Sequence, residues 1–441
     1  MRPGGIPLIF RLLMWRPPCE AGVFVCDRAG TSVSGHFATK ISPVRCAKVL
    51  VYLMSLGIYI QVPFCQTRCT YCNFHTGVVS SARFAPYAAA VQTEIRQHQR
   101  RLQQAGIILP GSLAQETVDT VYFGGGTPSL LDPQHLDAML DAIRETFIHD
   151  FREVTLEADP ETIDSQKSAA WAAAGINRVS FGVQSFSDVE LQAAGRMHRR
   201  ADIYRAVPIL DAAGIGNISF DLIAGLPHQT PASWCNSLDE LVQLAPRHVS
   251  IYLLEVDEGS RLGSELLRGG TKYSASAVPS DDAMAESYDL ARAVLSAAGY
   301  EHYEISNFAK PGFASEHNRK YWRRAPYLGF GAGAYSFSGT ERWANAHDAA
   351  DYVQSIASGK IPVEQLEVIS TSQALEEELF LGLRQLAGID LDRLQKFYGV
   401  SISDRFLPLE SSGLLERDGT VVRLAPKHLS ISNEVFVELM R

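Results

Sequence analysis

The chain has 441 residues, 46% of them hydrophobic and 20% charged, which is the balance of a globular protein with two or three domains. Its formal net charge of −9 excludes a protein whose surface as a whole binds nucleic acid or anionic membranes, because such surfaces must attract phosphate groups. No apolar run reaches the roughly 18 residues that a membrane-spanning helix needs, so we expect a soluble protein without a transmembrane segment.

Residues 1–53 differ from the rest of the chain. They mix proline, glycine and arginine, show no sustained apolar period and contain only two acids, Glu20 and Asp27. We predict a disordered extension or a misassigned start, with synthesis beginning at Met54, because Met54 leads directly into the first predicted strand. A mitochondrial targeting segment is the main alternative, although its prolines would interrupt the amphipathic helix that such a segment needs, and a folded extension is the third. The predicted compartment is the cytoplasm, or the mitochondrion if residues 1–53 are a targeting segment.

A regular pattern of strands and helices begins near Gly57. Short apolar runs predict six strands, at 58–62, 120–123, 154–158, 178–183, 218–223 and 248–254. Apolar residues at helical spacing predict helices at 83–104, 134–147, 162–173, 189–194, 202–213 and 233–244. Six such units in series favour an α/β fold with parallel strands, an open and partial (β/α)6 barrel of the TIM type. A doubly wound sheet is the alternative, and both folds place the ligand site at the carboxyl ends of the strands.

The second half of the chain predicts further elements. A helix is expected at 281–298 and a strand at 303–308, followed by a glycine-rich stretch at 329–334. Helices at 372–386 and 390–398, with a hairpin at 415–424 that turns at Asp418–Gly419, predict a small winged-helix-like domain. We therefore divide the chain into a core at 54–280, an accessory region at 281–367 and a C-terminal domain at 368–441.

The cysteines are unevenly distributed along the chain. Three of the seven, Cys65, Cys69 and Cys72, fall within eight residues directly after the first predicted strand. An odd total in a large chain argues against a secreted disulfide scaffold. The C-x-x-x-C-x-x-C spacing lacks the fourth close ligand of a structural zinc site, whereas three soft thiolates suit an iron–sulfur cluster with one iron left open. A zinc site and a chance grouping of cysteines remain the alternatives.

Polar and glycine residues stand near the ends of the predicted strands. They are Gly125, Gly126 and Thr127 after the second strand, Glu157 at the end of the third, Gln184 at the end of the fourth, Asp221 in the fifth, and Arg196 beyond Gln184. Each has an ordinary explanation as a cap, a turn or a solvated side chain. Together they predict a polar rim at one end of the sheet.

The cysteine motif, written C-x-x-x-C-x-Tyr-C with Tyr71 before its last cysteine, resembles that of the radical S-adenosylmethionine (SAM) superfamily. The resemblance implies that Cys65, Cys69 and Cys72 hold a [4Fe–4S] cluster whose open iron binds the amino and carboxylate groups of SAM. In that superfamily an electron from the cluster cleaves SAM to methionine and a 5′-deoxyadenosyl radical. Tyr59, in the first predicted strand, would lie near the adenine or the cluster, with packing in the core as its alternative role.

The same resemblance assigns roles to the polar rim. It implies that the loop Gly124-Gly-Gly-Thr-Pro128 contacts the methionine part of SAM and that Glu157 and Asp221 accept hydrogen bonds from ribose hydroxyls. Arg196 would meet the methionine carboxylate, and Gln184 would supply an amide.

From Gly57 to its end the chain resembles one branch of the superfamily, the oxygen-independent coproporphyrinogen III dehydrogenases and the related haem chaperones. The shared motifs lie at 62–65, 124–128, 181–185, 220–227 and 303–308. The dehydrogenases carry a fourth cysteine two residues after the third, where this chain has Phe74. The chaperones carry His-Asn-x-x-Tyr-Trp, which matches His317-Asn-Arg-Lys-Tyr-Trp322 here. Both features indicate the haem chaperones.

The chaperone motif has a chemical rationale. The resemblance implies that His317 is an axial ligand of haem iron, for which imidazole is well suited. Tyr321 and Trp322 would offer flat apolar faces to the porphyrin, and Lys320 with the neighbouring arginines would meet its propionates. A solvated basic loop whose aromatic side chains pack on the core is the alternative.

The resemblance therefore implies haem as bound cargo and acceptor haemoproteins, respiratory and membrane-associated ones among them, as partners. We expect no nucleic-acid partner. A coproporphyrinogen III dehydrogenase and a non-catalytic relative with a structural cluster are the competing hypotheses. The sequence leaves the recipient, the electron donor, the cleavage of SAM and the oligomeric state open.

Overall fold

The computed structural model describes residues 55–107, 109 and 115–440. The predicted extension at 1–53 and the predicted start at Met54 lie outside the described residues. Within the described ranges, no helix is both long enough and apolar enough to cross a membrane.

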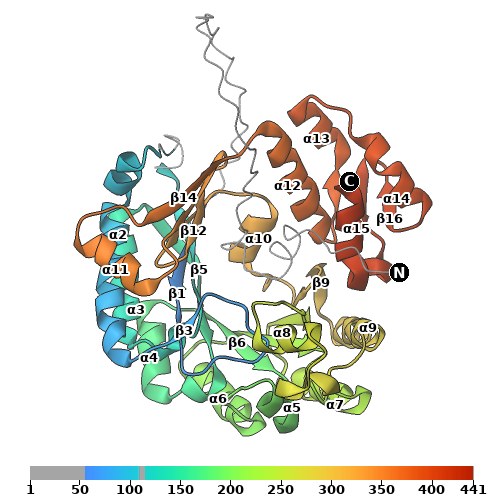
Figure 1. Ribbon diagram of the computed structural model, residues 1–441, viewed down its shortest axis with the longest axis horizontal. Helices are drawn as coiled ribbons and strands as arrows, with labels where there is room; N and C mark the ends of the chain where they lie inside the picture. Colours follow the sequence, from blue (N-terminus) through green and yellow to red (C-terminus); the bar gives the residue numbers. More distant parts are fainter. Residues whose placement is uncertain (1–54, 108, 110–114, 441) are drawn as a thin grey trace, which may run out of the picture.

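Six parallel strands in chain order form the centre of the fold (Figure 1). They are β1 (Leu56–Val62), β4 (Val118–Gly125), β5 (His149–Ala158), β6 (Arg178–Gln184), β7 (Asn217–Ala224) and β8 (His248–Leu253). Each strand pairs in parallel with the next one in this order. The arrangement confirms the predicted α/β fold of six strand–helix units, and it gathers the carboxyl ends of these strands at one end of the sheet.

Helices connect these strands and lie on their outer side, as Figure 1 shows. They are α2 (Phe84–Gln104), α3 (Pro133–Thr146), α4 (Ser165–Ala174), α5 (Asp188–Ala193), α6 (Arg200–Ala212) and α7 (Pro231–Leu244). Local sequence sets their ends. The Asp132 side chain accepts a hydrogen bond from Gln134 N at the start of α3, where proline fills the first helical position. Gly175, with a φ of 99°, ends α4.

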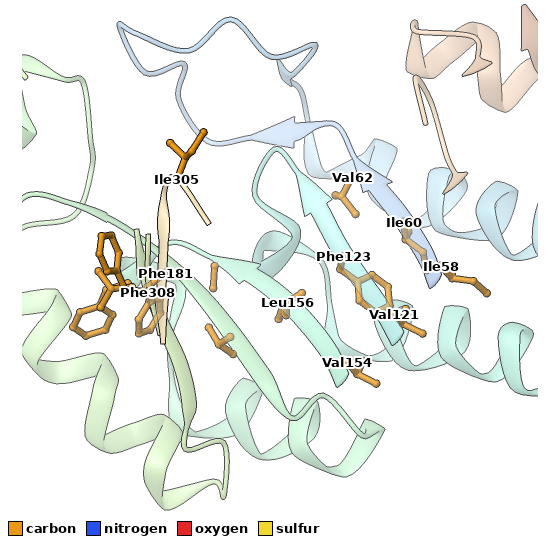
Figure 2. Packing of buried hydrophobic residues seen from close by; sticks show 14 of the residues in the cluster. Ile58, Ile60, Val62, Val121, Phe123, Val154, Leu156, Phe181, Ile305 and Phe308 are labelled. Atoms are coloured by element: carbon orange, nitrogen blue, oxygen red, sulfur yellow. The ribbon is translucent and has the colours of Figure 1, made fainter. Parts of the chain in front are cut away.

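The two faces of the parallel strands carry different side chains. On the outer face, Ile60 of β1 lies beside Phe123 of β4 in the apolar core (Figure 2). Because successive side chains of a strand point to opposite faces, Tyr59 and Tyr122 face inward. Their rings stack with centroids 5.9 Å apart. The inner face of the sheet is therefore free to carry aromatic and polar side chains toward a ligand.

The sheet continues beyond β1 with four strands that the sequence did not predict. They are β11 (Tyr327–Phe330), β12 (Tyr335–Phe337), β13 (Glu341–Asn345) and β14 (Val363–Val368). Of these, β11 is parallel to β1 and the other three are antiparallel to their neighbours. The glycine-rich stretch turns from β11 into β12, and a Cβ on Gly329 would lie 2.0 Å from the Tyr335 carbonyl oxygen. Since one sheet contains strands from 54–280 and 281–367, the predicted boundary between these regions stays a prediction.

The prediction of a single strand at 303–308 is wrong. Instead, β9 (Glu301–Glu304) and β10 (Asn307–Ala309) form an antiparallel hairpin beside β8. The Glu304 carboxylate accepts hydrogen bonds from Ser306 N, at 2.9 Å, and from the Asn307 side chain. These side-chain bonds stabilise a turn within a run whose composition is typical of a strand.

The C-terminal part has its own small sheet. It consists of β15 (Ile389–Asp390), β16 (Leu415–Asp418) and β17 (Val421–Leu424), accompanied by α12 (Thr371–Arg384), α13 (Leu391–Tyr398), α14 (Leu407–Ser411) and α15 (Ser432–Leu439). The pairing of β16 with β17 confirms the predicted hairpin, which turns at Gly419 with a φ of 60°. Four further helices lie between later strands of the large sheet: α8 (Arg261–Leu267), α9 (Asp281–Ala297), α10 (Glu316–Trp322) and α11 (Ala349–Ala357). Of these, α10 contacts both β4 and α12, which places the predicted haem motif beside the inner strands.

Candidate functional site

One pocket, of about 230 Å³, is lined by the twelve residues that are predicted to hold the cluster, to contact SAM or to ligate haem iron. They are Tyr59, Cys65, Cys69, Cys72, Gly125, Gly126, Thr127, Glu157, Gln184, Arg196, Asp221 and His317. They come from the inner face and carboxyl ends of the parallel strands, from the loops that follow, and from α10. Their proximity makes a shared site chemically possible, while the role of each residue stays a prediction.

The cysteine loop is fixed on both of its flanks. It begins in β2 (Phe64–Cys65), which pairs with β3 (Gly77–Val78) after the loop. In its middle, Thr70 N donates a hydrogen bond to Ala194 O at 2.9 Å, and Thr70 O accepts one from Leu262 N at 2.8 Å. The loop is therefore held between the segment after α5 and the start of α8.

The three thiols line one pocket and fit an iron–sulfur cluster. Burial is the main cause that raises the pKa of Cys72 to about 12, and the neighbouring Cys69 contributes to the rise. Burial likewise raises the pKa of Cys65. A cationic centre is therefore needed to hold these sulfurs as thiolates. The pocket offers three soft sulfur ligands from one loop, which suits an iron–sulfur cluster with one iron left open.

The glycine loop after β4 packs directly on the cysteine strand. Gly126 N donates to Val62 O at 2.8 Å, and Thr127 N donates to Phe64 O at 2.7 Å. A Cβ on Gly126 would lie only 2.5 Å from Phe64 O. Any side chain at this position would push the loop away from the cysteines, so the close approach of the two backbones requires glycine.

Arg196 is buried between the cysteine loop and the end of β5. It forms an ion pair with Asp159, donates to Gly182 O at 2.8 Å and contacts Cys69 Sγ at 3.4 Å. Burial acts to lower the pKa of Arg196, but Asp159 and the Cys69 thiol outweigh this effect and raise it. Sequence reasoning missed Asp159, which also accepts a hydrogen bond from Thr127 Oγ1 at 3.2 Å. Asp159 follows Glu157 by two residues, so the two-residue period of a strand would have predicted that both side chains project to the same face.

Two half-buried acids line the pocket. Glu157 accepts hydrogen bonds from Tyr122 OH at 2.9 Å and from Gly125 N at 3.0 Å, and burial raises its pKa to about 7. Asp221 accepts from Ser180 Oγ at 3.0 Å, and burial raises its pKa as well. Both carboxylates retain lone pairs for further donors such as the hydroxyls of a ribose.

Gln184 sits at a point of backbone strain. Its φ of 63° is left-handed, and the register between β6 and β7 shifts between Phe181 and Gln184. A Cβ on Gly182 would lie 3.0 Å from both the Gln184 amide nitrogen and the Arg196 guanidinium. The strain and the crowding both occur where β6 ends at the pocket, a common situation at binding sites.

His317 lies at the inner end of α10 and is 1% exposed. Its Nδ1 shares a hydrogen bond of 3.0 Å with Thr120 Oγ1, and its Nε2 shares one of 2.9 Å with Tyr321 OH. Burial, reinforced by Lys320, lowers its pKa to about 3, so the imidazole is neutral. Both ring nitrogens are thus engaged, and ligation of iron by either one requires a hydrogen bond to break.

Most cations predicted to meet propionates already have acidic partners. Lys320 pairs with Asp119 at 2.7 Å. Arg319 pairs with Glu316, and Arg324 with Glu377, each at 2.7 Å. Arg323 is exposed at the end of α10.

Two family models match the chain. The radical SAM superfamily model matches residues 59–241, and the model of the HemN C-terminal domain matches residues 369–428. Among solved structures, the coproporphyrinogen III oxidase HemN of Escherichia coli has a TM-score of 0.73 at 21% identity, covering 88% of this chain and 91% of that one. This likeness shows a common fold.

Curated relatives match most of the chain. The heme chaperone HemW of Bacillus subtilis is 33% identical, over 86% of this chain and 97% of its own length. The heme chaperone HemW of Synechocystis is 37% identical, over 77% of this chain and 80% of its own. The mitochondrial radical S-adenosyl methionine domain-containing protein 1 of Bos taurus is 32% identical, with 87% of each chain covered. By this similarity along nearly the whole length of its relatives, the chain belongs to the HemW family of the radical SAM superfamily.

Proposed function

We propose that this protein is a haem chaperone, which binds haem and delivers it to acceptor haemoproteins. The observation that carries the proposal is the similarity to heme chaperone relatives along almost their entire length. Phe74 supports it, because this residue occupies the position of the fourth cysteine of the dehydrogenases. The motif His317–Trp322 supports it further, since it forms α10 at the pocket.

The pocket is proposed to hold a [4Fe–4S] cluster on Cys65, Cys69 and Cys72, with SAM beside it. When bound, the cluster supplies an electron and an open iron position for SAM. The protein's own residues bind and orient SAM: the glycine loop lets the backbone approach the methionine part, and Glu157 and Asp221 accept hydrogen bonds from the ribose. Buried Arg196 supplies a cation for the methionine carboxylate.

Haem is proposed to bind at α10. Trp322 is half-buried and lines the pocket, and Arg323 is exposed at the end of α10. The Arg323 guanidinium is available to a porphyrin propionate. We propose respiratory, membrane-associated haemoproteins as recipients and the cytoplasm as the compartment.

Haem titration beside an enzyme assay tests the proposal. The full chain, reconstituted anaerobically with iron and sulfide, is titrated with haem, and a parallel sample receives reductant, SAM and coproporphyrinogen III. We expect saturable haem binding and no protoporphyrinogen. Formation of protoporphyrinogen would show that the protein is a coproporphyrinogen III dehydrogenase instead. Absence of haem binding would contradict the proposal that it is a haem chaperone.

Replacing Asp221 by alanine is expected to weaken SAM binding without loss of iron. The change removes a charged acceptor, whose hydrogen bonds contribute about 1.5–3 kcal/mol, or roughly tenfold or more in affinity. Calorimetric titration with SAM measures the effect. The matched control is Asp211→Ala, since Asp211 is an exposed aspartate on α6. Equal affinity of the Asp221 variant and the unchanged protein would remove Asp221 from the SAM site.

SAM affinity is expected to fall as the pH is lowered from about 8 to about 6. Burial raises the pKa of Glu157 to about 7, so its carboxylate becomes protonated in this window and loses capacity as an acceptor. Titrations across the window should show a steeper loss for the unchanged protein than for Glu157→Gln, since the ionisation of SAM itself is common to both. Identical pH profiles would contradict the assignment.

A further inference from the structure

The start of α10 is anchored on the same strand as Glu157. The Glu153 carboxylate of β5 accepts hydrogen bonds from Ser315 Oγ at 3.1 Å, Glu316 N at 3.0 Å and His317 N at 2.9 Å. Glu153 precedes Glu157 by four residues, so both carboxylates lie on the inner face of β5. The position of His317 relative to the pocket is therefore set by the strand that carries Glu157.

The His317 ring is fixed in its plane and packs on Tyr122. Its hydrogen bonds to Thr120 on β4 and to Tyr321 on α10 hold the ring from two sides. The imidazole stacks on the Tyr122 ring with centroids 5.2 Å apart and planes inclined by 29°. Tyr122 therefore stacks on the rings of both His317 and Tyr59.

These two ring contacts restrict the position of the Tyr122 hydroxyl. Its oxygen lies 2.9 Å from Glu157 Oε1, to which it donates. A Cβ on Gly124 would lie 2.9 Å from both Tyr122 Cε1 and Tyr59 OH, so a side chain at position 124 would displace these two rings. Removing the imidazole would open space on one face of Tyr122 and allow its ring to tilt away from Glu157.

We propose that His317 is a positioning residue of the SAM site, which holds Tyr122 so that its hydroxyl donates to Glu157. The inference rests on the proposed use of Glu157 as a ribose contact. It assigns the histidine of the predicted haem motif to the pocket interior, where its two nitrogens bind neighbouring side chains.

The first test uses the protein without SAM. The titration of Glu157 is followed in the full chain by NMR of carboxyl-labelled glutamate, with Glu157→Gln to assign the signal. Because the bond from Tyr122 lowers the pKa of Glu157, both His317→Ala and Tyr122→Phe are expected to raise the midpoint above about 7, and the double variant to raise it no further than Tyr122→Phe. The other acids that raise the pKa of Glu157, Asp221 and Asp159, are the same in every variant.

The matched control is His98→Ala. His98 is also a buried histidine stacked on an aromatic ring, Phe147 at 4.6 Å, but it lies on α2 away from this pocket. An unchanged Glu157 midpoint in His317→Ala, or an equal shift in His98→Ala, would overturn the proposal. Should His317→Ala fail to fold, His317→Asn, which retains an amide near the Nδ1 position, takes its place.

The second test measures SAM affinity in the cluster-loaded protein. Loss of one oriented neutral hydrogen bond predicts roughly three- to tenfold weaker binding in His317→Ala and no change in His98→Ala. Equal affinity of His317→Ala and the unchanged protein would overturn the proposal. If the unchanged protein binds no SAM while the Glu157 midpoint shifts as expected, the proposed SAM site fails and the positioning of Tyr122 by His317 stands.

Discussion

Replacing Cys65, Cys69 or Cys72 by alanine is expected to abolish the iron–sulfur cluster. The three thiols line one pocket and are the protein ligands available there, so the loss of any one leaves too few thiolates. Burial raises the pKa of Cys72 to about 12, which means that only a bound metal centre keeps it ionised. Iron and sulfide content and the brown absorbance after anaerobic reconstitution measure the effect.

Cys235→Ala is the matched control, since Cys235 is exposed on α7 and should be dispensable. Cys19, Cys26 and Cys46, which lie outside the described residues, are expected to be dispensable as well. Full iron content in any of the three motif variants, or loss of iron from Cys235→Ala alone, would show that the ligand assignment is incorrect.

Asp159→Ala is expected to destabilise the protein by about 3–5 kcal/mol, because it leaves the buried Arg196 guanidinium without its acidic partner. The side chains of this pair are only 9% and 21% exposed, for Arg196 and Asp159 respectively. Without Asp159, the Arg196 side chain can move away from the Cys69 sulfur that it contacts. We therefore expect reconstitution of the cluster to become less efficient as well. Urea unfolding and iron content per chain measure the two effects.

An exposed ion pair provides the comparison for Asp159→Ala. Asp289 pairs with Arg292 on α9, and its side chain is 51% exposed, so Asp289→Ala should cost no more than about 1 kcal/mol. An equally small loss in the free energy of unfolding for Asp159→Ala would mean that solvent already reaches Arg196. It would also mean that Asp159 does not hold the Arg196 side chain in place.

The parallel strands could be predicted because their signals are local. Each is a short apolar run between turn residues, and the cysteine and glycine motifs follow β1 and β4 directly. Because the carboxyl ends of parallel strands meet at one end of the sheet, residues as distant in sequence as Gly125 and Asp221 line one pocket. The strands β11 to β14 were not predicted because they are only three to six residues long, too short for a clear pattern. The first of them, β11, pairs with β1, which is distant in sequence, and the pattern of a single segment does not encode such a partner.

The partners of the site residues were harder to predict than the residues themselves. Tyr122 could have been found from the two-residue period, since Phe123 beside it faces the core. The environment of His317 could not, because its hydrogen bond to Thr120 joins residues 197 positions apart. A motif read from sequence identifies a chemical group, whereas the fold decides which of its atoms remain accessible.

Haem transfer to a haem-free respiratory b-type protein in lipid vesicles tests the central claim most directly. The haem-loaded, cluster-reconstituted full chain is mixed with increasing amounts of this acceptor, and transfer is followed by absorbance. Apomyoglobin in excess gives the rate of spontaneous haem dissociation. If the protein is a haem chaperone, we expect the rate of haem transfer to rise with acceptor concentration and to exceed the rate of spontaneous haem dissociation. A rate equal to dissociation at every acceptor concentration would contradict the account.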